Sequence, residues 1–171
     1  RMLFYDTENK RQVDVFVGVF AMCHRLDLSQ RLDQHPLSLD AADLLLTKLQ
    51  IHEINRKDLV DAVRLLLTHE NADIAGGGDG TTYAMSLDRL RAVTSTDWGW
   101  FTTVTDNLQL VREAASDLLE PVEATLVETR AEEIDQALRA APKSMRWKAR
   151  SMVGRKTPWY ELPEEVGGAH A

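Results

Sequence analysis

The stretch LDAADLLLTKLQIHEINRKDLVDAVRLLL, residues 39–67, decides the fold, because it predicts two amphipathic helices joined by a tight polar turn. The first helix carries one cation, Lys48, among leucines. A lysine on a leucine-rich face is costly unless its ammonium reaches water or meets an anion. The second helix places Asp58 and Asp61 together beside its apolar stripe. The sequence therefore predicts one cation and two carboxylates at the edge of a packed helix pair.

Both helices carry signals for their first residues. Ser38 or Asp40 can cap the first helix, where Asp40 followed by Asp43 gives a start like a capping box, and Asn55 can cap the second. Asp58 then falls at the third helical position, where a carboxylate stabilises the exposed amides and the positive helix end by about 0.3–1 kcal/mol. That role needs no ligand, but it does not account for Asp61 or Lys48. A structural and a functional interpretation of this cluster both stay open.

Upstream of the helix pair, residues 2–28 predict a small antiparallel sheet. Residues 2–5 and 12–17 are typical of two strands around a polar turn, and residues 23–28 alternate again as a third strand. Within the second strand, Asp14 points to the face opposite Val13 and Val15. A charged residue on the wet face of an edge strand also prevents aggregation. Spacing alone favours that role for Asp14 over metal binding.

Downstream, residues 71–85 predict a glycine-rich linker, since glycines stand at 76, 77, 78 and 80. This segment lacks the lysine of a phosphate-binding loop, and no strand is expected to lead into it. We expect no regular β-structure after residue 70, because no apolar run of period 2 occurs there.

Residues 86–141 predict a helical bundle. Ser86 can cap a short helix, Thr96 or Asp97 can start a longer one, and Pro121 suits the first turn of the next. Helical spacing favours a core role over base stacking for Trp98, Trp100 and Phe101. Four residues of the last helix are predicted to be buried: Val122, Leu126, Ile134 and Leu138. The tail, residues 159–163, is expected to pack on these helices in extended form.

Charge is uneven along the chain, which has 171 residues and a net charge of −7. Residues 106–141 hold nine acids and three bases, whereas residues 143–156 hold six bases and no acid. The basic segment could meet phosphates, with Trp147 as a stacking surface. We favour the alternative that it docks on the acidic helices before it, since charge runs usually settle within the protein or in water.

Other functional classes find no support. No apolar run approaches the ~20 residues of a membrane span, and no signal peptide is present, so we expect a cytoplasmic protein without a membrane partner. The single Cys23 suits a reducing compartment. Histidine and cysteine spacings match no zinc site, and no serine-hydrolase elbow occurs. Because the chain opens with Arg1, we expect it to be a fragment whose upstream part is missing.

The succession Lys48, Arg56, Lys57-Asp58 and Asp61 resembles the distal motifs of nucleotidyltransferase-fold proteins of the AbiEii toxin type, which are bacterial and whose catalytic sheet is like that of DNA polymerase β. The resemblance covers about residues 1–70. The later helices and the tail from residue 142 to 166 look like an actinobacterial family described only as nucleotidyltransferase-like.

The resemblance implies Mg²⁺ and a nucleoside triphosphate (NTP) as cofactors, and a set of residues to hold them. Asp14 would be the metal ligand, because two divalent ions must hold the triphosphate during nucleotidyl transfer. Lys48 would bind the triphosphate, together with Arg56 and Lys57. The implied catalytic residues are Asp14, Lys48, Asp58 and Asp61, of which the last two would position Lys48 or polarise the acceptor.

One departure from the family is visible in the sequence. The resembled catalytic core needs a Gly-Ser or Gly-Gly turn and a D-x-D pair upstream of Asp14, and the chain has no Gly-Ser pair, no D-x-D pair and no glycine pair before residue 76. One carboxylate cannot hold two metal ions. We therefore expect this chain alone to be catalytically incomplete.

Together these observations predict an α+β fold. Residues 1–70 would form the C-terminal part of a nucleotidyltransferase-like domain, residues 71–85 a linker, and residues 86–171 a helical bundle with a basic segment. Two functions remain open: nucleotide transfer from an NTP to an RNA, protein or small-molecule acceptor when the protein is complete, or a non-catalytic interaction module that keeps the scaffold. Homo-oligomerisation also stays open.

Overall fold

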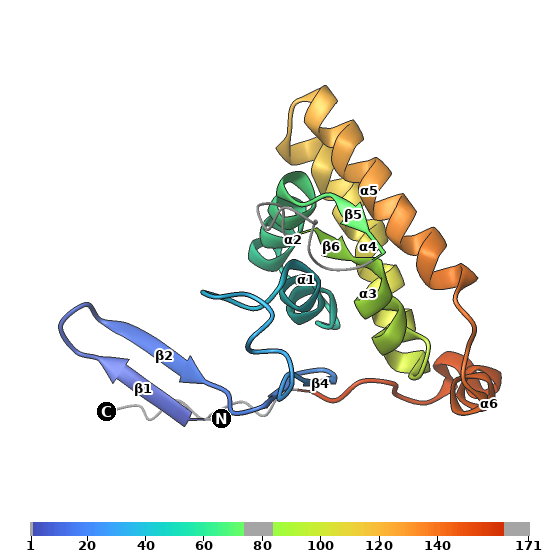
Figure 1. Cartoon of the computed structure of the whole chain (residues 1–171), viewed down its shortest axis with the longest axis horizontal. Coiled ribbons are helices and arrows are strands. Elements are labelled where there is room, and N and C mark those ends of the chain that lie inside the picture. The colour runs from blue at the N-terminus through green and yellow to red at the C-terminus, as the bar shows by residue number, and fades with distance from the viewer. Residues whose placement is uncertain (1, 74–83, 163–171) are drawn as a thin grey trace.

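The computed structural model describes residues 2–73 and 84–162. It confirms the α+β class: small antiparallel strand pairs at the N-terminus precede a mostly helical remainder (Figure 1). The glycine run at 76–80, and with it most of the expected linker, lies outside the described residues. No helix among the described residues is long and apolar enough to cross a membrane.

The N-terminal strands form two separate ribbons, so the expectation of one sheet over residues 2–28 is wrong. Strands β1 (Met2–Asp6) and β2 (Arg11–Val15) pair antiparallel, and β3 (Val19–Ala21) pairs with β4 (Arg25–Asp27). Gly18, with φ +70, separates the two ribbons, in a conformation that glycine adopts without a steric penalty. At three residues, β3 is too short to show the alternation that predicts a strand.

The helix pair forms as predicted. Helix α1 spans Ala41–Leu49 and helix α2 spans Arg56–Thr68. The amide of Asp43 donates to Asp40 Oδ1 at 2.8 Å, and the amide of Asp58 donates to Asn55 Oδ1 at 3.0 Å, which confirms both predicted caps. Each cap satisfies an amide that would otherwise lack a partner within its helix.

Two short strands contradict the expectation that no β-structure follows residue 70. Strands β5 (Asn71–Ala72) and β6 (Met85–Ser86) pair in parallel at the two ends of the expected linker. A pair of two-residue strands carries no apolar alternation, so hydrophobic periodicity cannot reveal it.

The remaining helices are α3 (Leu87–Thr94), α4 (Trp98–Leu118), α5 (Pro121–Ala140) and α6 (Met145–Val153), followed by a 3₁₀ turn, Gly154–Lys156. Ser86 caps α3, Asp97 caps α4, and Pro121 opens α5, as the sequence predicts. The predicted burial on α5 is only half right. Val122 and Leu126 are 83% and 39% exposed, and the buried apolar face is instead Ala124, Val127, Ala131, Ile134 and Leu138.

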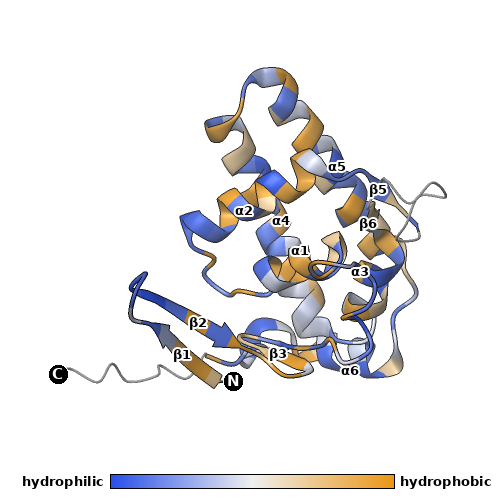
Figure 2. Ribbon diagram, turned by 60° about the vertical axis from the view of Figure 1, so that its left-hand side comes forward, coloured by the Kyte–Doolittle hydropathy of each residue, from blue (hydrophilic) through white to orange (hydrophobic). Residues whose placement is uncertain are grey.

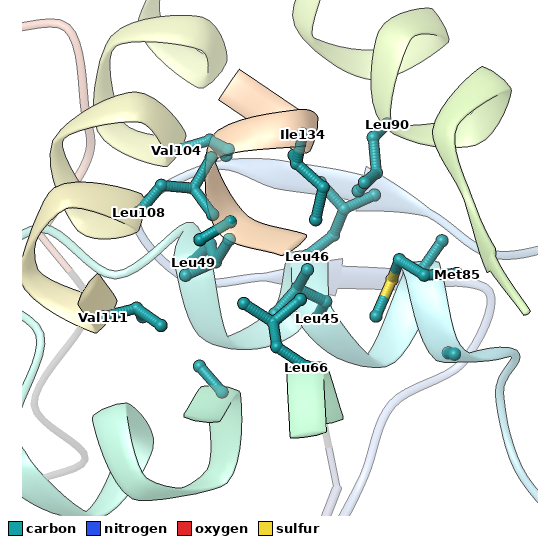
Figure 3. Close-up of a cluster of buried hydrophobic side chains, with 14 of the residues drawn as sticks. Leu45, Leu46, Leu49, Leu66, Met85, Leu90, Val104, Leu108, Val111 and Ile134 are labelled. Atoms are coloured by element: carbon teal, nitrogen blue, oxygen red, sulfur yellow. The ribbon is translucent and has the colours of Figure 1, made fainter. Parts of the chain in front are cut away.

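A single hydrophobic core joins the helix pair to the later helices. Leu45, Leu46, Leu49 and Leu66 meet Leu108 and other buried side chains from α3, α4 and α5 in one cluster (Figure 3). The core therefore crosses the expected division at residues 71–85. By contrast, the β1–β2 hairpin extends away from the helices in both overall views (Figures 1 and 2).

The aromatic residues at the start of α4 share the predicted packing role only in part. Trp100 is buried in the core, whereas Trp98 and Phe101 are partly exposed. Trp147 packs edge-on against Phe101, with ring centroids 5.3 Å apart. Trp147 is thus a packing residue of α6 rather than a free stacking surface.

The basic segment 143–156 docks on its own chain, as favoured, but mainly through neutral partners. Arg155 forms an ion pair with Asp106 of α4 at 2.7 Å. Lys143 donates to backbone carbonyls at the end of α5, and Arg150 donates to the carbonyls of residues 154, 157 and 158. Carbonyl oxygens satisfy these donors without neutralising their charge.

Candidate functional site

Three of the four candidate catalytic residues meet at the edge of the helix pair. Lys48 lies in the last turn of α1, and its Nζ donates to Asp58 Oδ1 at 2.8 Å and contacts Asp61 Oδ2 at 2.9 Å. Asp58 and Asp61 lie on one face of α2 because residues three apart are neighbours on a helix. The predicted group of one cation and two carboxylates is therefore present.

The capping arrangement of α2 fixes Asp58. Its backbone amide donates to Asn55 Oδ1, and Asn55 Nδ2 donates back to Asp58 Oδ2 at 2.7 Å. Asp58 thus binds Asn55 through one carboxylate oxygen and Lys48 through the other. The structural role of Asp58 and its contact with Lys48 do not compete, because they use different atoms.

Lys48 remains charged in this environment. Burial alone would lower the pKa of its ammonium, but the hydrogen bonds and charges of Asp58 and Asp61 outweigh that effect and raise the pKa above its usual value. The Lys48 side chain is 28% exposed, so water still reaches the group. The site thus offers a fixed, partly open cation.

A pocket of about 310 Å³ opens beside this cation. Its lining combines the edge of α1 with one face of α2: Leu44, Lys48, Asp61, Arg64, Leu65 and Thr68. Arg64 is exposed, and its guanidinium makes no hydrogen bond or ion pair with the part of the chain that the structure describes. We call this pocket, with its two cations, the Lys48 pocket.

Sequence reasoning missed Arg64, although the signal was present. Residues 61, 64, 65 and 68 follow the i, i+3, i+4, i+7 pattern of a single helix face. Arg64 therefore had to lie on the face of Asp61, and so next to Lys48. An arginine beside a lysine, with no counter-ion among the described residues, suits a multiply charged anion, because its planar fork binds phosphate oxygens in pairs.

The other two candidate phosphate-binding residues do not reach this pocket. Arg56 and Lys57 are the first two residues of α2, both are exposed, and neither lines the Lys48 pocket. Their backbone positions at the start of α2 follow from the Asn55 cap. They add positive charge near the site without forming part of its walls.

Asp14, the candidate metal ligand, lies on the β1–β2 hairpin. It pairs with Leu3 across the ribbon, and its Oδ1 accepts a hydrogen bond from Gln12 Nε2 at 3.0 Å. The hairpin extends away from α1 and α2 (Figure 1). The structure does not bring Asp14 to the three residues at the helix pair.

The described residues do not fit a pair of catalytic metal ions. Within residues 2–73 and 84–162, no group of three or more histidine, cysteine, aspartate or glutamate side chains is placed to hold a metal. Asp14 is a single carboxylate, and two-metal catalysis needs several oxygen ligands. We therefore derive no metal-dependent step for this chain.

A second charged cluster, also missed, is structural. Asp43 is fully buried and binds Arg31 Nε and Arg89 Nε, both at 2.7 Å, while Arg31 also pairs with Asp40. Asp43 thus ties α1 to α3 and to the connector before α1. In the sequence only its capping role was visible, because Arg31 and Arg89 are 12 and 46 residues away.

Comparison with known proteins adds no relative: no family model matches the chain, and neither a curated protein nor a solved structure matches it. Only the geometry of the site therefore bears on the function of this chain.

Proposed function

We propose that this chain is part of a nucleotidyltransferase-like protein and that the Lys48 pocket holds the triphosphate of an NTP. The observation that supports this proposal most is the Lys48 ammonium, fixed by two carboxylates beside an open pocket that Arg64 also lines, and Arg64 has no ionic partner among residues 2–73 and 84–162. Two cations in one pocket, Lys48 from α1 and Arg64 from α2, can share the charge of a polyphosphate, and Asp58 and Asp61 keep Lys48 oriented before the ligand arrives.

Each residue has a defined task in this proposal. Lys48 supplies a charge-assisted hydrogen bond to a phosphate oxygen, and Arg64 supplies a second, forked contact. Asp61 both orients Lys48 and keeps it charged. The acceptor, whether RNA, protein or a small molecule, would approach from outside this pocket. We propose a cytoplasmic location for this function, with which the single buried thiol, Cys23, is compatible.

Titration of the chain with ATP and GTP, with and without Mg²⁺, tests this proposal. Loss of one charge-assisted contact costs about 1.5–3 kcal/mol, so Lys48→Met and Arg64→Gln should each weaken triphosphate binding by roughly ten- to a hundredfold. Lys148→Gln, an exposed lysine on α6, is the matched control and should bind as the wild type does. Unchanged binding by both pocket variants would remove the Lys48 pocket from the function.

Asp14 lies on the hairpin, away from the Lys48 pocket, and this position favours a second candidate function, a non-catalytic interaction module. The hairpin that carries it exposes Phe4, Tyr5 and Val13, as a contact surface would. Incubation with labelled triphosphates, Mg²⁺ and candidate acceptors tests the module, since this chain alone is expected to transfer no nucleotide under either candidate. Transfer that Asp14→Ala abolishes would exclude the module.

A further inference from the structure

A second, larger pocket shares no residue with the Lys48 pocket. It has a volume of about 450 Å³ and is enclosed by four segments: residues 23–25 before and at the start of β4, the N-terminal turn of α4, helix α6, and the tail at residues 158–161. We call it the tryptophan pocket, because Trp98, Trp100 and Trp159 line it. No sequence pattern joins these segments.

The aromatic walls of the tryptophan pocket are held in place by specific contacts. The rings of Trp98 and Trp159 meet edge to face, with centroids 6.0 Å apart. Trp159 Nε1 donates to Thr103 Oγ1 at 3.1 Å, so the indole keeps one orientation. Tyr160 stacks on His52 with ring centroids 3.7 Å apart. The walls are therefore formed before any ligand enters.

The tail packs closely against the start of α4 at Gly99. A Cβ atom at residue 99 would lie 2.5 Å from the backbone oxygen of Trp159, closer than real contacts allow. The amide of Glu161 donates to the carbonyl of Cys23 at 2.9 Å and closes the next side. The absent side chain at residue 99 thus lets the tail approach closely enough to form the pocket.

Three arginines give the tryptophan pocket its charge. Arg150 lies over the ring of Trp98 at 4.8 Å and donates only to neutral carbonyls. Arg25 and Arg146 are exposed, and their guanidinium groups make no hydrogen bond or ion pair with the described part of the chain. Three guanidinium charges therefore line this pocket without a carboxylate ion pair among the described residues.

The two carboxylates in the lining offset these charges only in part, because Asp97 and Glu161 bring two negative charges against three guanidinium groups. Asp97 Oδ1 already accepts hydrogen bonds from the amides of Gly99 and Trp100, at 2.7 and 3.1 Å. Glu161 lies on the exposed tail. His24, also in the lining, is buried, and burial lowers its pKa to about 4, so at neutral pH it adds no charge. The balance in the pocket remains positive.

We propose that the tryptophan pocket binds a planar aromatic molecule that carries a phosphate group, of the size of a nucleoside monophosphate. The volume lies within the range of about 300–1,000 Å³ that small-molecule sites occupy. Indole walls provide an apolar surface for a planar ring. Arg25 and Arg146 can bind phosphate oxygens with their planar forks. A neutral ring would leave the arginines unused, and inorganic phosphate alone would leave the walls unfilled.

The test uses the tryptophans of the pocket as reporters. Three of the four tryptophans in the chain line it, so ligand entry should change the intrinsic fluorescence. We would titrate the full chain with AMP, adenosine and inorganic phosphate separately, and repeat the AMP titration by calorimetry. AMP should bind at least about tenfold more tightly than either adenosine or phosphate, because only AMP uses both the walls and the arginines.

Variants then locate the binding. Arg25→Gln and Arg146→Gln change exposed side chains that have no partner in the described part of the chain, so both variants should fold, and each should weaken AMP binding about tenfold or more. Lys148→Gln, on the same helix as Arg146 but outside the pocket lining, should bind AMP as the wild type does. The proposal is overturned if AMP does not saturate the fluorescence change, if adenosine binds as tightly as AMP, or if Lys148→Gln weakens binding as much as Arg146→Gln.

Discussion

Replacing Lys48 with methionine should lower the free energy of unfolding by about 1–2 kcal/mol. Methionine keeps most of the apolar stem but removes the ammonium that contacts Asp58 and Asp61. The side chains of Lys48, Asp58 and Asp61 are 28%, 15% and 35% exposed, so the group is neither a surface pair nor a buried one. Surface pairs contribute about 0.2–1 kcal/mol, and breaking a buried pair costs about 3–5 kcal/mol.

Contacts that remain after the substitution limit the loss. Asp58 keeps the hydrogen bond from Asn55 Nδ2 and its place in the first turn of α2. Asp61 loses its lysine but stays partly hydrated. The effect also has a defined pH range. Because the pKa of Lys48 is raised in the folded chain, its contribution is complete below the ordinary value of 10.5 and is lost as the pH rises through the higher folded value.

Urea denaturation of wild type, Lys48→Met, Asp61→Asn and the double variant, at neutral pH, measures this contribution. The cycle isolates the Lys48–Asp61 contact, for which we expect a coupling of about 0.5–1 kcal/mol. Asp61 is preferable to Asp58 because Asp58 also takes part in the α2 cap. A coupling of zero would show that the contact does not form in solution. A loss above about 3 kcal/mol for Lys48→Met would show that the carboxylates are more deeply buried than the structure indicates.

Two further predictions concern groups that the fold buries. Burial lowers the pKa of His24 to about 4 from 6.5, so the unfolded chain binds a proton that the folded chain rejects. Relative to His24→Gln, wild type should lose about 3 kcal/mol of unfolding free energy as the pH falls from 7 to 4, as measured by urea denaturation at each pH. If His24 were exposed, the difference in unfolding free energy between the two proteins would not change with pH. Asp43→Asn should destabilise the chain by about 3–5 kcal/mol in thermal or urea unfolding, because it removes the buried charge that pairs with Arg89 and one of the two carboxylates that pair with Arg31, which keeps Asp40. The exposed Asp88→Asn is its control, and equal effects of the two changes would refute the burial of Asp43.

Local signals allowed the helix starts to be predicted. Asn55, Ser86 and Asp97 each accept backbone amide bonds within their own first turn, so the information lies within a few residues of sequence. Lys48 and Asp58 could also be brought together, because a short turn between two amphipathic helices leaves few ways to pack them. These predictions depend on neighbours in the chain.

Features that depend on distant segments could not be predicted. On α5, Leu126 has the hydrophobic character of a core residue, yet the buried face of this helix includes smaller residues such as Ala124 and Ala131. Apolar character alone does not say which face a close helix contact selects, and small residues permit the closer approach. The tryptophan pocket is a similar case, since Arg25 and Arg146 are far apart in sequence and only the folded chain shows that they face one space.

The two proposed functions make opposite demands on the β1–β2 hairpin. Nucleotide transfer requires the Asp14 carboxylate to act beside the phosphates at Lys48, whereas the structure separates the hairpin from the helix pair (Figure 1). An isolated two-stranded hairpin is at best marginally stable in water, and this one exposes Phe4 and Tyr5. Its apolar side chains would therefore gain stability from packing against a further surface. If that surface supplies carboxylates beside Asp14, it completes a catalytic centre; if it supplies only apolar contacts, the hairpin is the contact surface of an interaction module.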